Sequence, residues 1–304
     1  MKPLLNTFAD LEKHLLDKGI KKTLALVGSH DSDALAAAVT ARKKGVVSTI
    51  LIGNAAKTRE ILRDLGEPEG DYRIIDQPDG KKAAHMASKM VLDGEADIPM
   101  KGKLTTADFM RAVLDKQYGF IPENGLLCQA TVFEFVSKNR LAIISDCAIN
   151  IAPDYAAKKK ILENAVKLAR LLGMELPRVA VIAPLEEVNP AIQSTIDAAM
   201  LAKACDRGQI SGCLVDGPLA LDNAVNLEAA KAKGIGGEVA GRADILIMPD
   251  LCTGNALVKS LHYFANINKS GNITGAALPI VMTSRTDTPE NKYHSILVSI
   301  FQSL

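Results

Sequence analysis

The sequence is poor in the features that mark several common classes of protein. It has no tryptophan, aromatic residues make up 4% of its 304 residues, and the formal net charge is +1. A charge so close to zero gives no broad attraction to nucleic acid or to a membrane surface. No apolar run reaches the roughly 18 residues that a membrane-spanning helix needs. We therefore expect no nucleic acid or membrane partner. The N-terminus alternates charged and apolar residues like an amphipathic helix, not a signal peptide, which favours a cytoplasmic location.

Cysteine and histidine show no pattern of a metal site or a disulfide framework. The five cysteines are an odd number without CxxC spacing, and the five histidines have no ligand-like spacing. Cys147, Cys213 and Cys252 lie in or beside apolar runs, so we expect small buried hydrophobic residues. His30 follows an apolar run, and is either a local polar residue, the simpler interpretation, or a side chain facing a ligand cleft. The chain also lacks the GxGxxG, GxxxxGK[ST], HExxH and GxSxG motifs.

Short apolar runs alternate with helix-like segments along the chain. The runs that we predict as strands are 23–30, 47–54, 72–76, 141–150, 178–184, 210–218, 243–250 and 277–284. This alternation predicts a mostly parallel sheet with helices on both faces, and the length suits two α/β lobes. A ligand cleft between the lobes is the default expectation.

Two segments in the second and third quarters of the chain carry candidate ligand-binding residues. In MKGKLTTADFM (100–110), Lys101-Gly102 precedes a helix that Thr105 or Thr106 is expected to cap, and a helix N-terminus beside a lysine suits an anion. In VDGPLALDNAV (215–225), Asp216 and Asp222 flank a Gly-Pro turn at the predicted carboxyl end of a strand. Either aspartate faces a ligand there or it bonds its own backbone.

Two further segments join a strand to a helix near the end of the chain. In PDLCTGNALVKSL (249–261), the run Thr253-Gly254-Asn255 is expected to present backbone N–H groups to an anion, with Lys259 one turn further on. In TSRTDTPENKYHSI (283–296), Ser284, Arg285 and Asp287 precede a proline suited to the first turn of a helix. The arginine fork and the serine hydroxyl suit phosphate.

Taken in order, these segments and SDCAIN (145–150) resemble the phosphate acetyltransferase/butyryltransferase family along the whole chain, and its butyryl branch most closely. The resemblance implies the isocitrate/isopropylmalate dehydrogenase-like architecture, with two three-layer α/β/α lobes and a cleft between them. It places the first lobe at 1–127 with 285–304 and the second at 128–284. It also implies a homodimer or higher homo-oligomer.

The activity implied by the resemblance is the reaction acyl-CoA + phosphate = acyl phosphate + CoA. Coenzyme A is then a substrate, and no metal or further cofactor is expected. The candidate catalytic residues are Ser284, Arg285, Asp287 and Glu290. The candidate substrate-binding residues are Lys101, Gly102, Asp216, Thr253, Gly254, Asn255 and Lys259.

The sequence departs from the family pattern at two positions. The acetyl branch has an arginine before the strand that begins here at Cys128, and its catalytic aspartate falls near Asn291. Asp287 and Glu290 are the neighbouring carboxylates, so either is a candidate general base. Three alternatives stay open: a phosphate acetyltransferase, a non-catalytic acyl-CoA-binding paralogue, and a metal- and NAD-dependent dehydrogenase of the same fold. The dehydrogenase would use aspartates of the set Asp216, Asp222, Asp244 and Asp250 as ligands.

Overall fold

In the computed structural model, which describes residues 5–304, the chain divides into two compact units. We call Phe8–Gly125 with Lys269–Leu304 the terminal unit, and Leu126–Asn268, with which residues 5–7 group, the central unit. The lobes expected from the sequence differ from these units mainly in residues 269–284, which group here with the terminal unit, and also in residues 5–7 and 126–127, which group with the central unit. The grouping has a physical basis, because the first strand of that segment packs against the C-terminal helix.

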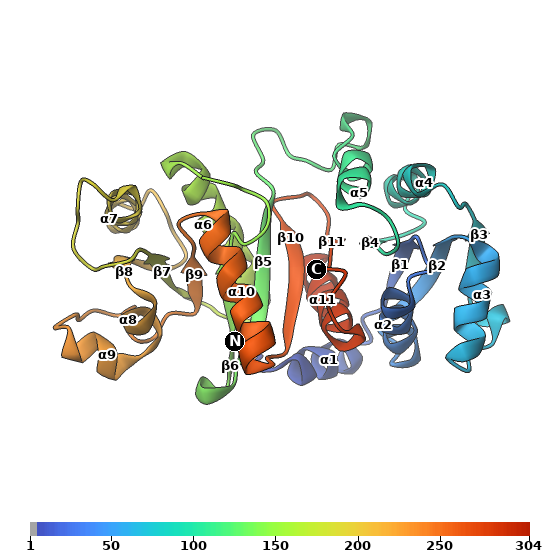
Figure 1. The fold of residues 1–304 in the computed structure, drawn as a ribbon, viewed down its shortest axis with the longest axis horizontal. Helices are drawn as coiled ribbons and strands as arrows, with labels where there is room; N and C mark the ends of the chain where they lie inside the picture. The colour runs from blue at the N-terminus through green and yellow to red at the C-terminus, as the bar shows by residue number, and fades with distance from the viewer. Residues whose placement is uncertain (1–4) are drawn as a thin grey trace. The chain divides into compact units, whose positions relative to one another are not determined.

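The terminal unit is a mixed sheet with helices packed against it (Figure 1). Its strand order is β3-β2-β1-β4-β11-β10, and only β10 runs antiparallel to its partner within this order. The strands are β1 (Lys22–Val27), β2 (Val47–Gly53), β3 (Arg73–Asp76), β4 (Ile98–Lys101), β10 (Lys269–Thr274) and β11 (Ile280–Val281). The helices are α1 (Phe8–Asp17), α2 (Ser32–Lys43), α3 (Ala55–Asp64), α4 (Gly80–Leu92), α5 (Thr106–Val113) and α11 (Pro289–Gln302), with short 3₁₀ helices η1 (Glu69–Asp71) and η2 (Lys116–Tyr118).

The central unit repeats the same plan with a different strand order. Its order is β5-β6-β9-β7-β8, in which β5 and β6 are antiparallel and the other pairs are parallel. The strands are β5 (Cys128–Phe135), β6 (Arg140–Ser145), β7 (Arg178–Ile182), β8 (Leu214–Leu219) and β9 (Ile245–Ile247). The helices are α6 (Tyr155–Leu171), α7 (Gln193–Asp206), α8 (Leu221–Val225), α9 (Leu227–Ala232) and α10 (Leu251–Ala265), with the 3₁₀ helix η3 (Val136–Lys138).

The α/β class predicted from the alternating runs is therefore confirmed, with mixed sheets. β1 and β2 are almost wholly buried, as expected for parallel strands covered on both faces. The antiparallel strands β5 and β10 were not predicted as strands from the apolar runs. β10 reads KSGNIT, and its polar residues are nevertheless all buried.

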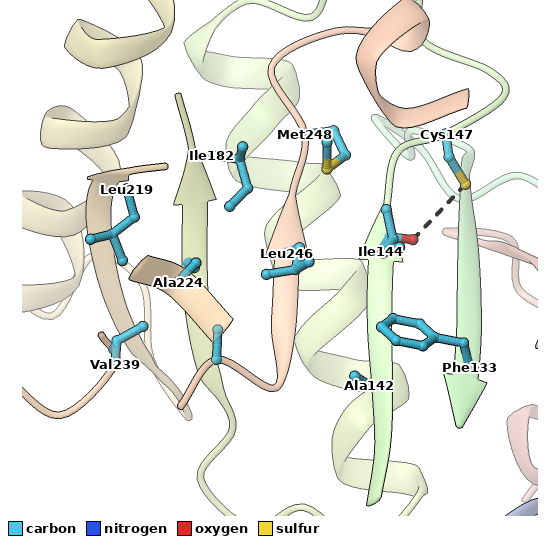
Figure 2. Close-up of a cluster of buried hydrophobic side chains, with 12 residues drawn as sticks. Phe133, Ala142, Ile144, Cys147, Ile182, Leu219, Ala224, Val239, Leu246 and Met248 are labelled. Carbon is cyan, nitrogen blue, oxygen red and sulfur yellow. Dashed lines mark hydrogen bonds between the residues drawn. The ribbon is translucent and has the colours of Figure 1, made fainter. Parts of the chain in front are cut away.

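Apolar side chains from several strands form the core of the central unit (Figure 2). Phe133 and Ile144 come from the antiparallel pair, Ile182 and Leu246 from the parallel strands, and Met248 follows β9. One face of α10 packs against this core through Leu257, Val258 and Leu261. The core thus holds α10, which carries several of the candidate binding residues, against the strands of the central unit.

Side-chain caps define where most helices begin. Thr105 accepts a hydrogen bond from Asp108 N and caps α5, which settles the predicted choice between Thr105 and Thr106. Other capping residues that accept from their α-helix are Asp31, Asn54, Asp79, Asp154, Asn226, Asp250 and Thr288. Across residues 5–304, no helix is both long and apolar enough to cross a membrane.

Candidate functional site

The candidate catalytic residues lie in the loop that joins β11 to α11. Ser284 and Arg285 are exposed, and α11 starts at Pro289 with Thr288 as its cap, as the sequence predicted for a proline in the first turn. Asp287, by contrast, is buried, with 6% of its surface exposed. The loop therefore presents a hydroxyl and a guanidinium to solvent, while its aspartate points into the unit.

The carboxylate of Asp287 is occupied by partners within the terminal unit. It forms a buried ion pair with Lys269 at the start of β10, and Oδ2 accepts the N–H of Ser284 at 2.8 Å. These two contacts tie the loop to the sheet. Each carboxylate oxygen of Asp287 thus has a partner inside the unit, and the role of Asp287 as a candidate base stays a prediction.

A second lysine holds the same loop from the helix side. Lys292 is 2% exposed, and its Nζ donates to the carbonyl oxygens of Ser284 at 3.0 Å and Asp287 at 2.6 Å. The neighbouring Asn291 is also buried, and its Oδ1 accepts the N–H of Lys269 at 3.0 Å. Both side chains thus have structural partners. Sequence reasoning missed the roles of Lys269 and Lys292, since both pairings depend on the folded arrangement of β10 and α11.

Arg285 lines a cavity of about 490 Å³ in the terminal unit, which we call the Arg285 cavity. Its other walls come from the N-terminus of α2 and from the segment after β4, with these lining residues: His30, Asp31, Ser32, Asp33, Ile61, Gly102, Lys103, Leu104 and Thr105. The cavity therefore combines Arg285, Lys103 and the positive end of a helix with the carboxylates of Asp31 and Asp33. The two cations and the helix N-terminus are the groups in it that suit an anion. Of the predicted residues, it brings together Arg285 and Gly102.

Lys101 is buried beside this cavity. It is 4% exposed, and its Nζ makes a long 3.4 Å hydrogen bond to the carbonyl of Gly102. Burial lowers the pKa of Lys101; Asp31 opposes this shift, while the positive charges of Arg285 and Lys292 reinforce it. A bound anion would relieve the repulsion among these cations.

Gly102 allows β1 and β4 to end in close contact. A Cβ atom on Gly102 would lie 2.6 Å from the carbonyl oxygen of Gly28, and one on Gly28 would lie 2.7 Å from Lys103 N. Gly28 also has a φ of +68°, which favours glycine. The two glycines therefore let the segment after β4 lie directly beside the loop that leads to α2.

His30 faces the Arg285 cavity, which answers the choice that the sequence left open. Burial lowers its pKa, and the charges of Lys57 and Lys103 act in the same direction, while Asp31 opposes them. The lowered pKa favours the neutral imidazole, which can form a hydrogen bond without a charge. Asp31 and Lys103 were not predicted as site residues, although the strand–turn–helix pattern at GSHDSD is a local signal for this helix N-terminus.

In the central unit, α10 begins at Leu251, two residues before the run Thr253-Gly254-Asn255. Asp250 is the cap, and its Oδ1 accepts the N–H of Thr253 at 2.8 Å and the Thr253 hydroxyl at 3.0 Å. The N–H of Gly254 bonds the carbonyl of Asp250. The prediction that residues 253–255 present free backbone N–H groups to an anion is therefore wrong for the first two.

The remaining predicted residues of α10 have different roles. Gly254 is buried where α10 meets the end of β6, and a Cβ there would lie 2.5 Å from the carbonyl oxygen of Asp146. Asn255 donates from Nδ2 to the carbonyl of Cys147 at 3.3 Å. Lys259 is exposed. Gly254 and Asn255 therefore fasten the helix to the sheet.

The two aspartates of the 215–225 segment do not flank a turn. β8 continues through Asp216, Gly217 and Pro218, so Asp216 lies inside the strand. β8 is the edge strand of the central unit's order, where proline is tolerated because no partner needs its N–H. Asp216 accepts the N–H of Gly217, and burial raises its pKa. Asp222 lies in α8 and pairs with Lys233 at 2.9 Å.

The cysteines are unequal in exposure. Cys128, Cys147 and Cys213 are buried, whereas Cys252 is exposed, which corrects its expected burial. Cys252 stands two residues before the buried Gly254 on α10, which places it on nearly the opposite side of the helix. Burial raises the pKa of Cys213 to about 12. Among residues 5–304, no group of three or more His, Cys, Asp or Glu side chains is placed to hold a metal ion.

Comparison with known proteins gives concordant matches. The model of the Phosphate acetyl/butaryl transferase family matches residues 74–300. A phosphate butyryltransferase of Clostridium acetobutylicum is 40% identical over 296 residues, covering 97% of this chain and 98% of the relative. A phosphate acetyltransferase of Thermotoga maritima is 39% identical over 282 residues, covering 93% and 95%.

Solved structures resemble this chain as well. A branched-chain phosphotransacylase from Enterococcus faecalis superposes with a TM-score of 0.83 at 28% identity, covering 93% of this chain and 99% of that one. A phosphotransacetylase from Streptococcus pyogenes gives a TM-score of 0.80 at 20% identity, with 98% and 99% covered, which bears on the fold alone.

Proposed function

Since the chain belongs to the Phosphate acetyl/butaryl transferase family, we propose that it exchanges a short acyl group between coenzyme A and phosphate, as a phosphate butyryltransferase. The observation that carries the proposal is the Arg285 cavity, where a guanidinium, Lys103 and the N-terminus of α2 surround one space. Such a space suits inorganic phosphate or the phosphate of an acyl phosphate.

In the proposed reaction, a phosphate oxygen attacks the thioester carbon of acyl-CoA, a C–O bond forms, and the C–S bond breaks. The leaving CoA sulfur takes up a proton, and the reverse reaction removes it. Arg285 and the Ser284 hydroxyl would hold the phosphate oxygens, with Lys101 adding positive charge behind them. Fixed donors of this kind stabilise the transition state without having to reorganise, and holding both substrates in place supplies much of the remaining acceleration.

Within this proposal, Asp287 is a positioning residue. Its buried pairing with Lys269 and its bond to Ser284 N support that role. Glu290, the other candidate base, is exposed in the first turn of α11 and is the carboxylate that remains accessible in this segment. If the pH–rate profile of Glu290→Gln loses its acidic limb, Glu290 is supported as the general base. An unchanged profile would show that Glu290 is not the base.

No covalent acyl-cysteine is required by this chemistry. We expect a Cys128→Ser/Cys252→Ser variant to keep kcat/KM within about tenfold of the parent, with any loss due to packing at Cys128. Neither thiol lies among the residues that line the Arg285 cavity, which explains the small expected effect. The measurement is initial velocity with butyryl-CoA and phosphate. Mass-spectrometric detection of an acylated cysteine during turnover would contradict the prediction.

The acyl preference follows the butyryl branch. We expect a higher kcat/KM for butyryl- or isobutyryl-CoA than for acetyl-CoA, by a modest factor, because an added methylene in an apolar pocket contributes about 1–3 kcal/mol at most. Initial rates with the three thioesters at fixed phosphate measure it. An equal or higher value for acetyl-CoA would make phosphate acetyltransferase the better description.

Two alternatives from other classes make different predictions. A metal- and NAD-dependent dehydrogenase would form NADH with a hydroxy acid and a divalent metal. A non-catalytic acyl-CoA-binding paralogue would bind CoA thioesters without phosphate-dependent turnover. The isocitrate/isopropylmalate dehydrogenase-like arrangement of the lobes and the homodimer implied by the family resemblance remain part of the proposal, and a crystal structure and sedimentation of the purified chain test them.

A further inference from the structure

Two cysteines of the central unit lie side by side, away from the candidate catalytic loop. Cys205 is half-buried in the last turn of α7, and Cys213 is buried one residue before β8 begins. The Sγ atom of Cys205 lies 3.5 Å from the carbonyl oxygen of Cys213, and the two thiols are in hydrogen-bond contact. Neither residue lines the Arg285 cavity, so the proposed transfer reaction does not use this pair.

The backbone holds these two thiols together, because the chain turns back directly after Cys205. The N–H of Gly208 bonds the carbonyl oxygen of Cys205 at 2.9 Å, and Gly208 has a φ of +73°, which favours glycine. The N–H of Gln209 bonds the carbonyl oxygen of Ala204 at 2.8 Å. This turn returns the chain to the end of α7, so the proximity of the cysteines is built into the fold.

The surroundings of the two thiols suit them to different steps of thiol chemistry. Burial raises the pKa of Cys213 to about 12; Cys205 and Glu163 add to this shift, whereas the Arg170 guanidinium opposes it. Cys213 is therefore a poor target for a reagent in solution, while the half-buried Cys205 is within reach of one. Because the thiolate is the form that attacks a disulfide, Cys205 is suited to the first attack and Cys213 to a second attack within the protein.

We propose that Cys205 and Cys213 are a redox-active pair, which a low-molecular-weight disulfide oxidises to a reversible disulfide that fastens β8 to α7. The thiolate of Cys205 attacks one sulfur of the reagent, a mixed disulfide forms, and the first reagent thiolate leaves and takes up the proton lost by Cys205. Cys213 then attacks Cys205 Sγ, which forms the bond between them and expels the second reagent thiolate with the proton lost by Cys213. The pair is oxidised by two electrons, and the reagent is reduced to two thiols.

The contact between the thiols makes the second step feasible despite the high pKa of Cys213. Holding two reacting groups together replaces an encounter in solution by a step within one molecule, which offsets a small fraction of thiolate. The product carries no charge, so its burial has no desolvation cost of the kind that disfavours the thiolate.

The new bond would restrain the edge of the central unit's sheet. β8 ends the strand order of that unit and pairs with β7. Segments with few partners open at a lower free energy than the core. A covalent link from α7 to the residue before β8 therefore limits this opening, and it also protects both thiols from further oxidation.

Peptide mapping tests the proposal directly, because trypsin cleaves after Arg207 and so separates the two cysteines. Reduced full-length protein would be incubated with glutathione disulfide, blocked with N-ethylmaleimide in denaturant, and digested. We expect peptide 204–207 to be linked to peptide 208–231, in a monomer lighter by two hydrogen atoms, and dithiothreitol to remove the link. Unlinked peptides that are alkylated, a lasting glutathione adduct on Cys205, or a link to Cys252 would overturn the proposal.

Two variants assign the link to this pair. Cys205→Ser should lose the link and leave Cys213 free, with circular dichroism and urea unfolding like those of reduced wild type, since the change is conservative and half-exposed. Cys252→Ser is the matched control at an exposed cysteine of the same unit, and it should form the link as wild type does. Oxidation of Cys213 at the wild-type rate in Cys205→Ser would contradict the proposed order of attack.

Two rates test the chemistry and its structural consequence. Because Cys213 must lose its proton before it attacks, closure of the mixed disulfide should accelerate about tenfold per pH unit below its pKa. Hydrogen exchange of the β8 amides should be at least about threefold slower in oxidised than in reduced wild type, and glutathione disulfide should not change it in Cys205→Ser. Closure at a rate independent of pH would contradict attack by Cys213, and equal exchange in both states would contradict the fastening of β8.

Discussion

Replacing Arg285 by alanine should lower kcat/KM for phosphate by about 10²–10³, the usual effect of removing one donor that acts on the transition state. Arg285 is exposed in the loop and lines the cavity that also contains Lys103 and the N-terminus of α2. Because its side chain is exposed, the free energy of unfolding should hardly change. The measurement is initial velocity against phosphate concentration, with thermal unfolding followed in parallel.

The lysine substitution at the same position is the informative control. Arg285→Lys keeps the charge but not the planar fork that binds two phosphate oxygens at once, so it should restore only part of the lost rate. If Arg285 were an ordinary surface residue, both variants would stay within about threefold of wild type. That outcome would place the phosphate site elsewhere.

Asp287→Asn should destabilise the protein strongly and lower activity through the loop. The substitution leaves Lys269 buried without its counter-ion, and breaking one partner of a buried pair typically costs about 3–5 kcal/mol in the free energy of unfolding. The side-chain amide oxygen introduced at position 287 can still accept the N–H of Ser284. The loop should therefore keep its conformation but be held less firmly. Urea unfolding measures the change in the free energy of unfolding. The values of kcat and KM for phosphate, taken at low temperature, measure how the loosened loop affects the reaction.

The chain offers a matched control for this prediction in Asp222, whose ion pair with Lys233 lies on the surface of the central unit. Asp222→Asn should change stability little, because exposed pairs contribute little. A positioning role for Asp287 predicts a raised KM for phosphate with an unchanged shape of the pH–rate profile. If Asp287→Asn instead kept its stability and lost the acidic limb of that profile, Asp287 would be the general base after all.

Several features of the fold were predictable because they depend on neighbouring residues. Buried parallel strands such as β1 and β2 show as apolar runs, and Thr105 and Pro289 mark helix starts by local chemistry. The same logic applied to Asp250 would have placed the start of α10 correctly. In Asp-Leu-Cys-Thr (250–253), the aspartate stands three residues before the threonine, which is the spacing of a helix cap. The cap accepts the N–H of Thr253, so this N–H is not free for a ligand.

Other features could not be read from local sequence. β10 is polar in sequence, and its residues are buried by α11 and bonded by side chains such as Ser295 and Ser299. The pairing of Lys269 with Asp287 joins residues on different elements, and the burial of this aspartate follows only from the folded structure. The strand–loop–helix setting of Ser284 and Arg285 was thus predictable because it is local, whereas the partners of the buried polar residues depend on tertiary contacts.

The most direct test of the central claim is the release of CoA thiol from butyryl-CoA as phosphate is varied, with acyl phosphate trapped as a hydroxamate in the same samples. The account predicts thiol release that requires phosphate, saturates with it, and equals the hydroxamate formed. Arg285→Ala should lower the phosphate-dependent rate without abolishing CoA binding. Thiol release at the same rate without phosphate would indicate a hydrolase, and a folded protein that binds CoA but releases no thiol would indicate a binding paralogue. Either result would contradict the account.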